Sequence, residues 1–325
     1  MNVILPTAGL GTRLRPHTYS KPKPLISVAG KPVLGHILDR LTGLRLDKLV
    51  FIVGYLGEQI EAYVRKEYDL PVEFVVQHEL KGQADAVLLT RGLVSGPTLI
   101  LFVDTLVEAD LAKLNDVDAD GVMYVKEVDD PRRFGVAQVE NGRITRLIEK
   151  PATMENKLAV VGLYYLREIE QLFSATEELM ERNIQTKGEF YLADALQLMI
   201  DRGARIIPEQ VAVWEDCGKP ETVLETNRYL LDKGLTHEVP TENSILIPPV
   251  HIHDGATIQN SVIGPYVSIG AGSVIRNSII RNSIINGDAE LETVTLEESL
   301  IGDDAEVNGD FHRLNVGDSS QVCLG

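Results

Sequence analysis

The sequence predicts an α/β protein that ends in a short solenoid of repeated strands. Up to about residue 105, apolar segments typical of strands alternate with amphipathic segments typical of helices. From residue 252 onward, an aliphatic residue instead returns every five or six positions. The size of the chain fits this division, because 325 residues of which 44% are hydrophobic can bury one large core or two modest ones.

The alternating part begins with a strand. We expect strands at 2–5, 48–54, 72–77 and 98–104, and helices at 32–41, 56–68 and 84–94. Because each parallel return in a sheet needs a crossover, this order indicates a Rossmann-like, mainly parallel sheet with helices on both faces. Ligands bind beyond the carboxyl ends of the strands in such sheets. The loop after the first strand and Asp104 after the fourth are therefore expected at one edge.

The segment from about 105 to 235 mixes both kinds of element and continues the same domain. Its expected strands are 121–128, 135–140 and 159–166, and its expected helices are 167–183, 190–203 and 220–234. We predict a catalytic domain over 1–234, a linker over 235–244, and a repeat domain with a tail over 245–325.

The repeat after residue 252 has neither the period of a helix nor that of a simple strand. A sustained five-to-six-residue period is typical of a hexapeptide solenoid. Units that carry "IG" with a small or aliphatic residue four places later resemble the left-handed parallel β-helix, in which each short strand forms one side of a triangular coil. About ten such units predict roughly three coils. An ordinary antiparallel sheet is the alternative.

Charge and composition exclude several kinds of partner. The net charge of −17 disfavours nucleic acid and anionic membranes. No apolar run is long enough to span a bilayer, and the first residues lack the pattern of a secretory signal, so we expect a cytoplasmic protein. Cys217 and Cys323 are too few for a disulfide framework or a thiolate zinc site, and we expect both to be reduced thiols.

One segment departs from the acidic composition. Residues 1–38 contain no Asp or Glu and carry five basic residues, namely Arg13, Arg15, Lys21, Lys23 and Lys31. A solvated basic face would explain the charge alone. Gly9 and Gly11, however, follow a strand, where glycines let backbone N–H groups approach a phosphate. Arg13 and Lys23 add a bidentate guanidinium and an ammonium, which together suit a polyphosphate.

These residues carry a resemblance to a known family. "GLGTRLRPHT", "KPKPL" and "GKP" occur in the order and spacing of the sugar-1-phosphate nucleotidylyltransferases. The resemblance continues to about residue 230, and the repeat is similar to the C-terminal β-helix of one branch. It implies Mg²⁺-dependent transfer from an NTP to a sugar 1-phosphate, with release of pyrophosphate. Positioning and charge neutralisation carry such chemistry, because the attacking phosphate is already ionised.

The resemblance also implies roles at the nucleotide end. Gly9, Gly11 and Thr12 would cradle the triphosphate, Arg13 would stabilise the departing pyrophosphate, and Lys23 would contact the phosphates at the reacting centre. In "QHELKGQADAV", Gln77, Gly82 and Gln83 fall in the segment that recognises the base. Arg15, Lys21 and Lys31 are interpreted as background charge.

The remaining motifs imply a metal site and a sugar site. Asp104 ends "LILFVD" and Asp216 lies in "WEDCG", where the family places two aspartate ligands of Mg²⁺. Two carboxylates with phosphates and water suit that ion. The residues expected to hold the sugar or its phosphate come from "FGV", "IEKP", "VVGLYYL" and "TKGEF", and are Gly135, Glu149, Lys150, Gly162, Tyr164 and Lys187.

Several alternatives remain open at this point. The resemblance favours dTTP or UTP with glucose 1-phosphate, whereas mannose-1-phosphate guanylyltransferase is the alternative within the class. A hexapeptide acyltransferase with a histidine base is less favoured, because His251 and His253 precede or begin the first predicted coil and His312 follows the last. A non-catalytic regulatory homologue is disfavoured by the intact charged motifs. For the β-helix we expect a role in oligomerisation or in regulation, and we expect the protein to form a homo-oligomer.

Overall fold

The computed structural model describes residues 1–310 together with Val316 and Gln321. Cys323 and His312 therefore lie outside the described residues. The chain forms two compact units, which are described separately. The first contains Met1–Ser27 and Lys31–Thr226, and the second contains Val28–Gly30 and the chain from Asn227 onward.

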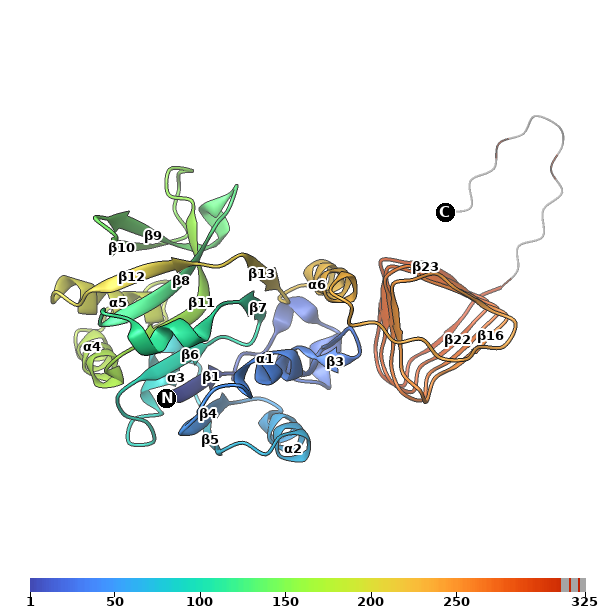
Figure 1. Ribbon diagram of the computed structural model, residues 1–325, viewed down its shortest axis with the longest axis horizontal. Coiled ribbons are helices and arrows are strands. Elements are labelled where there is room, and N and C mark those ends of the chain that lie inside the picture. Colours follow the sequence, from blue (N-terminus) through green and yellow to red (C-terminus); the bar gives the residue numbers. More distant parts are fainter. Residues whose placement is uncertain (311–315, 317–320, 322–325) are drawn as a thin grey trace. The chain divides into compact units, whose positions relative to one another are not determined.

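The first unit is built on a nine-stranded sheet whose N-terminal part is parallel (Figure 1). Four of its strands are neighbours in the order β6, β1, β4 and β5. Their bounds are Thr98–Leu101 (β6), Asn2–Pro6 (β1), Lys48–Val53 (β4) and Val72–Val76 (β5). Ile4 pairs with both Val50 and Ile100, so β1 is the central strand of this part. The predicted parallel arrangement of these four segments is confirmed.

The later strands make the complete sheet mixed. They are β8 (Gly121–Glu127), β9 (Gly135–Glu140), β10 (Arg143–Glu149), β11 (Leu158–Leu166) and β12 (Ile206–Gln210). Strand β11 pairs antiparallel with β6 of the parallel part and also with β8 and β9, and so links these later strands to it. A separate antiparallel pair is formed by β7 (Thr105–Glu108) and β13 (Val213–Asp216).

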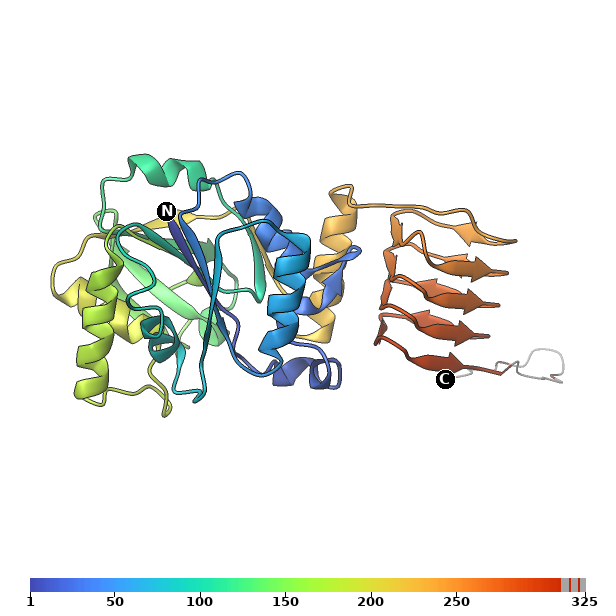
Figure 2. The same ribbon diagram turned by 90° about the horizontal axis from the view of Figure 1, so that it is seen from below.

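Helices cover both faces of this sheet, as predicted (Figure 2). Their bounds are Val33–Leu41 (α1), Gly57–Glu67 (α2), Gln83–Leu88 (α3), Ile169–Glu181 (α4), Leu192–Asp201 (α5) and Pro220–Asp232 (α6). Helices α1 and α2 lie on one side, and α3, α4 and α5 on the other. The buried side chains of the latter group pack with Ile4, Val50 and Ile100 of the sheet. Burial of this apolar surface supplies the main stabilisation of the unit.

Helix α3 is shorter than the segment 84–94 that the sequence predicts. Gly92 lies at φ +83°, in the left-handed region, and Arg91 forms an isolated bridge with Val94. A residue in this conformation cannot continue a right-handed helix, and glycine adopts it at little cost because it has no Cβ.

The second unit is dominated by a left-handed parallel β-helix. Figure 1 shows its triangular coils, and Figure 2 shows its strands stacked edge to edge. The first face consists of β14 (Ile245–Leu246), β17 (Val262–Ile263), β20 (Ile279–Arg281) and β23 (Thr295–Glu297). The second consists of β15 (Val250–Ile252), β18 (Val267–Ile269), β21 (Ser283–Ile285) and β24 (Leu300–Ile301). The third consists of β16 (Thr257–Gln259), β19 (Val274–Arg276), β22 (Glu290–Glu292) and β25 (Glu306–Asn308).

Within the described residues each face has four strands, so the prediction of roughly three coils was too low. The first coil begins at Ile245, before the segment in which the repeat is regular in sequence. For the same reason His251 lies within the first coil, in β15, and His253 directly follows that strand. The expectation that both histidines precede or only begin the coils is corrected accordingly.

Aliphatic side chains fill the interior of the coils, and small polar residues shape their corners. Ile263 and Ile280 are fully buried and pair in register along the first face. At one corner, Ser261 Oγ accepts a hydrogen bond from Ser278 N at 3.1 Å, and Ser278 Oγ accepts one from Val294 N at 3.2 Å. Such ladders satisfy backbone N–H groups that the turns would otherwise leave unpaired. Among the described residues, no helix combines the length and apolar character needed to cross a bilayer.

Candidate active site

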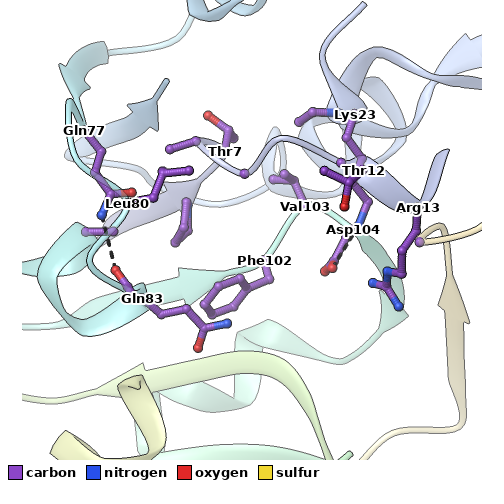
Figure 3. A pocket seen from close by; sticks show the side chains of 18 of the residues that line it. Thr7, Thr12, Arg13, Lys23, Gln77, Leu80, Gln83, Phe102, Val103 and Asp104 are labelled. Carbon is purple, nitrogen blue, oxygen red and sulfur yellow. Dashed lines mark hydrogen bonds and ion pairs between the residues drawn. The ribbon is translucent and has the colours of Figure 1, made fainter. Parts of the chain in front are cut away.

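The loop after β1 forms one wall of a cavity in the first unit (Figure 3). Gly11 has φ +62°, a left-handed conformation that favours glycine, and it precedes a short 3₁₀ helix over Thr12–Leu14. Thr18 Oγ1 donates to Gly11 O at 2.9 Å and holds the turn. At Gly9 an added Cβ would meet no atom within 4 Å, so this position is open. The loop can therefore bring its backbone close to a ligand in the cavity.

Lys23 and Asp104 meet on the same cavity. Lys23 Nζ donates to Asp104 Oδ2 at 3.0 Å, and the lysine side chain is only 15% exposed. Asp104 directly precedes β7 at the end of the segment that carries β6. The structure thus confirms that this aspartate and the loop after β1 lie at one edge of the sheet.

Asp216 is brought next to Asp104 by the pairing of β13 with β7. Asp216 pairs with Thr105, and Cys217 N donates to Asp104 O at 2.8 Å. Asp216 Oδ1 accepts a hydrogen bond from Gly218 N at 2.8 Å. Cys217 itself is a buried thiol, and burial raises its pKa to about 12, so it is not suited to act as a thiolate.

These two carboxylates fit a hard cation such as Mg²⁺. In the described part of the chain no cluster of three or more His, Cys, Asp or Glu side chains could hold a metal. Mg²⁺ commonly uses one or two carboxylates and takes its other ligands from phosphates and water. The donor set of Asp104 and Asp216 is therefore compatible with that ion, provided that a phosphate is bound beside them.

The other end of the first cavity is lined by Gln77, Leu80, Gly82 and Gln83. Gln77 is buried, and its Nε2 donates to Gly82 O at 3.2 Å (Figure 3). Gly82 has φ +123°, and an added Cβ would lie 2.4 Å from the carbonyl oxygen of Phe190. Only glycine fits here, so the turn between β5 and α3 can pass close to the backbone of Phe190.

A second cavity adjoins the first and contains the predicted sugar residues of β9, β10 and β11. It is lined by Gly135, Glu149, Gly162, Tyr164 and Asp216 among others. Glu149 is half-buried, and this burial raises the pKa of its carboxyl despite the nearby charges of Lys150 and Lys187. A Cβ added at Gly135 would lie 2.9 Å from Glu149 Oε2, so glycine leaves room for the carboxylate.

The two cavities have volumes of about 360 and 260 Å³ and share part of their lining. The shared residues are Arg13, Gln83, Phe102 and Asp104. Phe102 also contacts Tyr164 edge to face, with ring centroids 6.3 Å apart. Two ligands bound in these cavities would therefore meet at a wall that carries a guanidinium and a carboxylate.

Most predicted site residues are brought together by the fold. The first cavity is lined by Gly9, Gly11, Thr12, Arg13, Lys23, Gln77, Gly82, Gln83 and Asp104. Lys150 and Lys187 are different, because they line neither of these cavities. Both have positive φ, at 49° and 54°, and Lys187 is exposed. Arg15, Lys21 and Lys31 were interpreted as background charge. Of these three, Lys31 forms an ion pair with Asp39.

Sequence reasoning missed some of the lining. Phe102 stands two positions before Asp104, and strand alternation could have placed it on the same side. Gly218 closes the "WEDCG" motif, and a Cβ there would lie 2.8 Å from Asp216 Oδ1 and 2.9 Å from Arg13 Nη2. This glycine therefore lets the guanidinium and the carboxylate approach the same stretch of backbone.

Comparison with known families agrees with this geometry. The family model described as nucleotidyl transferase matches residues 1–233. The chain belongs to the nucleotidyl transferase family. A second model, described as the GlmU-like C-terminal hexapeptide, matches residues 234–299 of this nucleotidyl transferase.

Curated relatives of the nucleotidyl transferase include proteins named glucose-1-phosphate thymidylyltransferase and UTP–glucose-1-phosphate uridylyltransferase. The bifunctional protein GlmU of Methanococcus maripaludis is 33% identical over 80% of this chain. The matched region spans 62% of that relative's length. The UTP–glucose-1-phosphate uridylyltransferase AglF of Haloferax volcanii is 33% identical over 72% of this chain and 98% of its own.

A solved structure supports the fold of the nucleotidyl transferase. UDP-glucose pyrophosphorylase, solved with UDP-glucose, superposes with a TM-score of 0.61 at 22% identity. The match covers 71% of this chain and 98% of that one.

Proposed function

We propose that the chain transfers a nucleotidyl group from UTP or dTTP to glucose 1-phosphate in a Mg²⁺-dependent reaction. One observation carries the proposal, namely that the two adjoining cavities share a wall with Arg13 and Asp104. The nucleotide occupies the first cavity and the sugar phosphate occupies the second. Their reacting phosphates meet at the shared wall.

The reaction follows from this placement. An oxygen of the sugar phosphate attacks the α-phosphorus of the NTP, and the bond from that phosphorus to the bridging oxygen of the β-phosphate breaks. The electron pair leaves on pyrophosphate. Arg13 and Lys23 stabilise the charge that develops on the phosphates, which is the main contribution that a protein makes to such a transfer. No general base is needed, because the attacking phosphate is already ionised.

Asp104 and Asp216 are the residues that would hold Mg²⁺. The bound ion would neutralise phosphate charge near the reacting centre. Lys23 also contacts Asp104, so the same carboxylate positions the lysine beside the phosphates.

The sugar is held by residues of the second cavity that do not line the first. The carboxylate of Glu149 suits a pair of sugar hydroxyls, and Gly135 and Gly162 let the ring approach the backbone. Lys150 and Lys187 are proposed to reach the sugar phosphate from the margin of this cavity. Glucose 1-phosphate is preferred in the proposal because AglF, a relative matched over 98% of its own length, is named for that substrate.

The test is a substrate matrix. Pyrophosphate release is measured with UTP, dTTP, GTP, CTP and ATP against glucose, mannose and N-acetylglucosamine 1-phosphates, with and without Mg²⁺. We expect the highest kcat/KM for UTP or dTTP with glucose 1-phosphate. A preference for GTP with mannose 1-phosphate would favour the alternative guanylyltransferase, and turnover of acetyl-CoA without nucleotidyl transfer would favour an acyltransferase.

We further propose that the β-helix forms a homo-oligomer through its first face. Ile245, Val262 and Ile279 pair in register along this face, and Ile245 and Ile279 are 61% and 52% exposed. A row of exposed aliphatic side chains is typical of a protein interface. Sedimentation of the Ile279→Lys variant tests this proposal, with a shift to a smaller species as the expected result.

A further inference from the structure

Asp85 is a carboxylate beside the base end of the first cavity to which the proposed reaction assigns no role. It lies in the first turn of α3, and its Oδ2 accepts a hydrogen bond from Gln77 Nε2 at 3.0 Å. The same nitrogen donates to the carbonyl oxygen of Gly82 at 3.2 Å. An ionised carboxylate and a carbonyl only accept hydrogen bonds. The amide of Gln77 can therefore satisfy both only with its nitrogen turned toward them.

Both acceptors are held in place by other parts of the first unit. Asp85 is fixed in the first turn of α3, where the helix dipole favours a negative charge. The turn that contains Gly82 is tied on both sides to Phe190. Phe190 N donates to Lys81 O at 2.8 Å, and Ala84 N donates to Phe190 O at 3.0 Å.

The fixed nitrogen determines what Gln77 offers to a ligand. The amide oxygen Oε1 lies on the side away from Gly82, toward the cavity (Figure 3). Gln77 is only 7% exposed, so the amide sits where an unmatched polar group is costly. The cavity therefore presents a hydrogen-bond acceptor, and not a donor, at this position.

We infer that Asp85 is a positioning residue that sets nucleobase selectivity by holding the Gln77 amide with its oxygen toward the base. The inference rests on the proposed function. Uracil and thymine carry a ring N3–H, and guanine carries a ring N1–H, each of which donates to an acceptor. Cytosine N3 and adenine N1 are acceptors, so they would face Oε1 with opposed lone pairs. The selected class is bases with a ring N–H.

Steady-state kinetics on the full chain test this inference. Pyrophosphate release is measured with UTP and with CTP at saturating sugar 1-phosphate for wild type, Asp85→Leu and Asp85→Asn. We expect wild type to favour UTP in kcat/KM by at least about 100-fold, since a site built to pair an N–H rejects bases that lack it. Asp85→Leu removes the acceptor and lowers this ratio about tenfold or more. Asp85→Asn keeps an acceptor oxygen and retains most of the ratio, and KM for the sugar phosphate is unchanged in both.

Several results would overturn the inference. If folded Asp85→Leu lowers kcat/KM for UTP and CTP by the same factor, Asp85 has only a structural role. If wild type prefers CTP or ATP over UTP, dTTP and GTP, the orientation of Gln77 does not select the base, whether or not any variant folds. That result leaves nucleotidyl transfer intact. Absence of pyrophosphate release with every pair of substrates would instead overturn the proposed function, and the inference with it.

Discussion

Lys23 Nζ and Asp104 Oδ2 are hydrogen-bonded at 3.0 Å, although 81 positions separate the two residues in the chain. The lysine is largely shielded and the aspartate is more accessible, with side chains 15% and 38% exposed. The contact joins Lys23, which is proposed to contact the phosphates, to the proposed metal ligand. Both residues line the cavity proposed for the nucleotide.

Removal of the lysine charge is therefore expected to impair turnover. Lys23→Met should lower kcat by about 100-fold or more, because a positioned charge at the reacting phosphates is lost. The rate of pyrophosphate release at saturating concentrations of both substrates measures this loss of kcat. Lys31→Met is the control, since Lys31 pairs with the exposed Asp39 and does not line either cavity. Equal losses in the two variants would show that net charge, and not position, explains the effect.

The proposed metal ligands can be tested against a neighbour in the same strand. Asp104→Asn and Asp216→Asn should each weaken the Mg²⁺ dependence of nucleotide binding and lower turnover about 100-fold or more. Calorimetry with nucleotide, with and without Mg²⁺, measures the first effect. Glu215→Gln is the matched control, because strand alternation directs Glu215 away from the cavity that Asp216 lines. Undiminished metal-dependent binding in both aspartate variants would refute the assignment.

Glu149, the proposed sugar ligand, carries a cost in stability. Burial raises its pKa, so the folded protein holds this proton more tightly than the unfolded chain. Stability therefore falls as the pH rises through the raised pKa. Glu149→Gln should raise Tm at a pH of about 7.5, with the gain vanishing below about pH 4, where both states are protonated. The variant should also raise KM for the sugar phosphate about tenfold. Calorimetric scans over this pH range would contradict the assignment if the variant were less stable at the higher pH.

The two glycines of the loop should respond differently to alanine. Gly9→Ala places a methyl group in open space on the cavity wall, so Tm should be unchanged while KM for the NTP rises. Gly11→Ala forces a side chain into the left-handed region and within 3.0 Å of Lys23 Cβ. It should lower the free energy of unfolding by about 1–2 kcal/mol. Urea unfolding and NTP titration of both variants separate the effects, and a stability loss in Gly9→Ala alone would be the opposite of this expectation.

Neighbouring isoleucines in β20 provide a paired test of the β-helix. Ile280 is fully buried, whereas Ile279 is 52% exposed. Ile280→Ala should destabilise the solenoid by about 2–5 kcal/mol, because it leaves a cavity in the stacked core. Ile279→Ala should change the stability of the subunit fold by less than about 0.5 kcal/mol. Chemical unfolding followed under conditions of constant oligomeric state measures both, and similar losses would mean that the alternation of this strand is misassigned.

The local elements and many site residues were predictable because their signals lie close together in the chain. Alternating apolar segments indicated the strands around the central β1, and the glycines with Arg13 and Lys23 indicated a phosphate-binding loop. The repeat indicated the β-helix, although the number of coils was underestimated, because the first strand, at Ile245, precedes the regular period. In each case the structural requirement, such as a buried face or a residue with positive φ, is met by a few residues that are close together in the chain.

The sequence by itself determined the kinds of group in the site and the family to which the chain belongs. Only the tertiary structure decided which groups meet. The pairing of β13 with β7 brings Asp216 beside Asp104, and the turn after β5 brings Gln77 to Asp85. Lys150 and Lys187, in contrast, were left outside the cavities. Such contacts depend on strand register and on the packing of distant segments, which no local pattern of residues specifies.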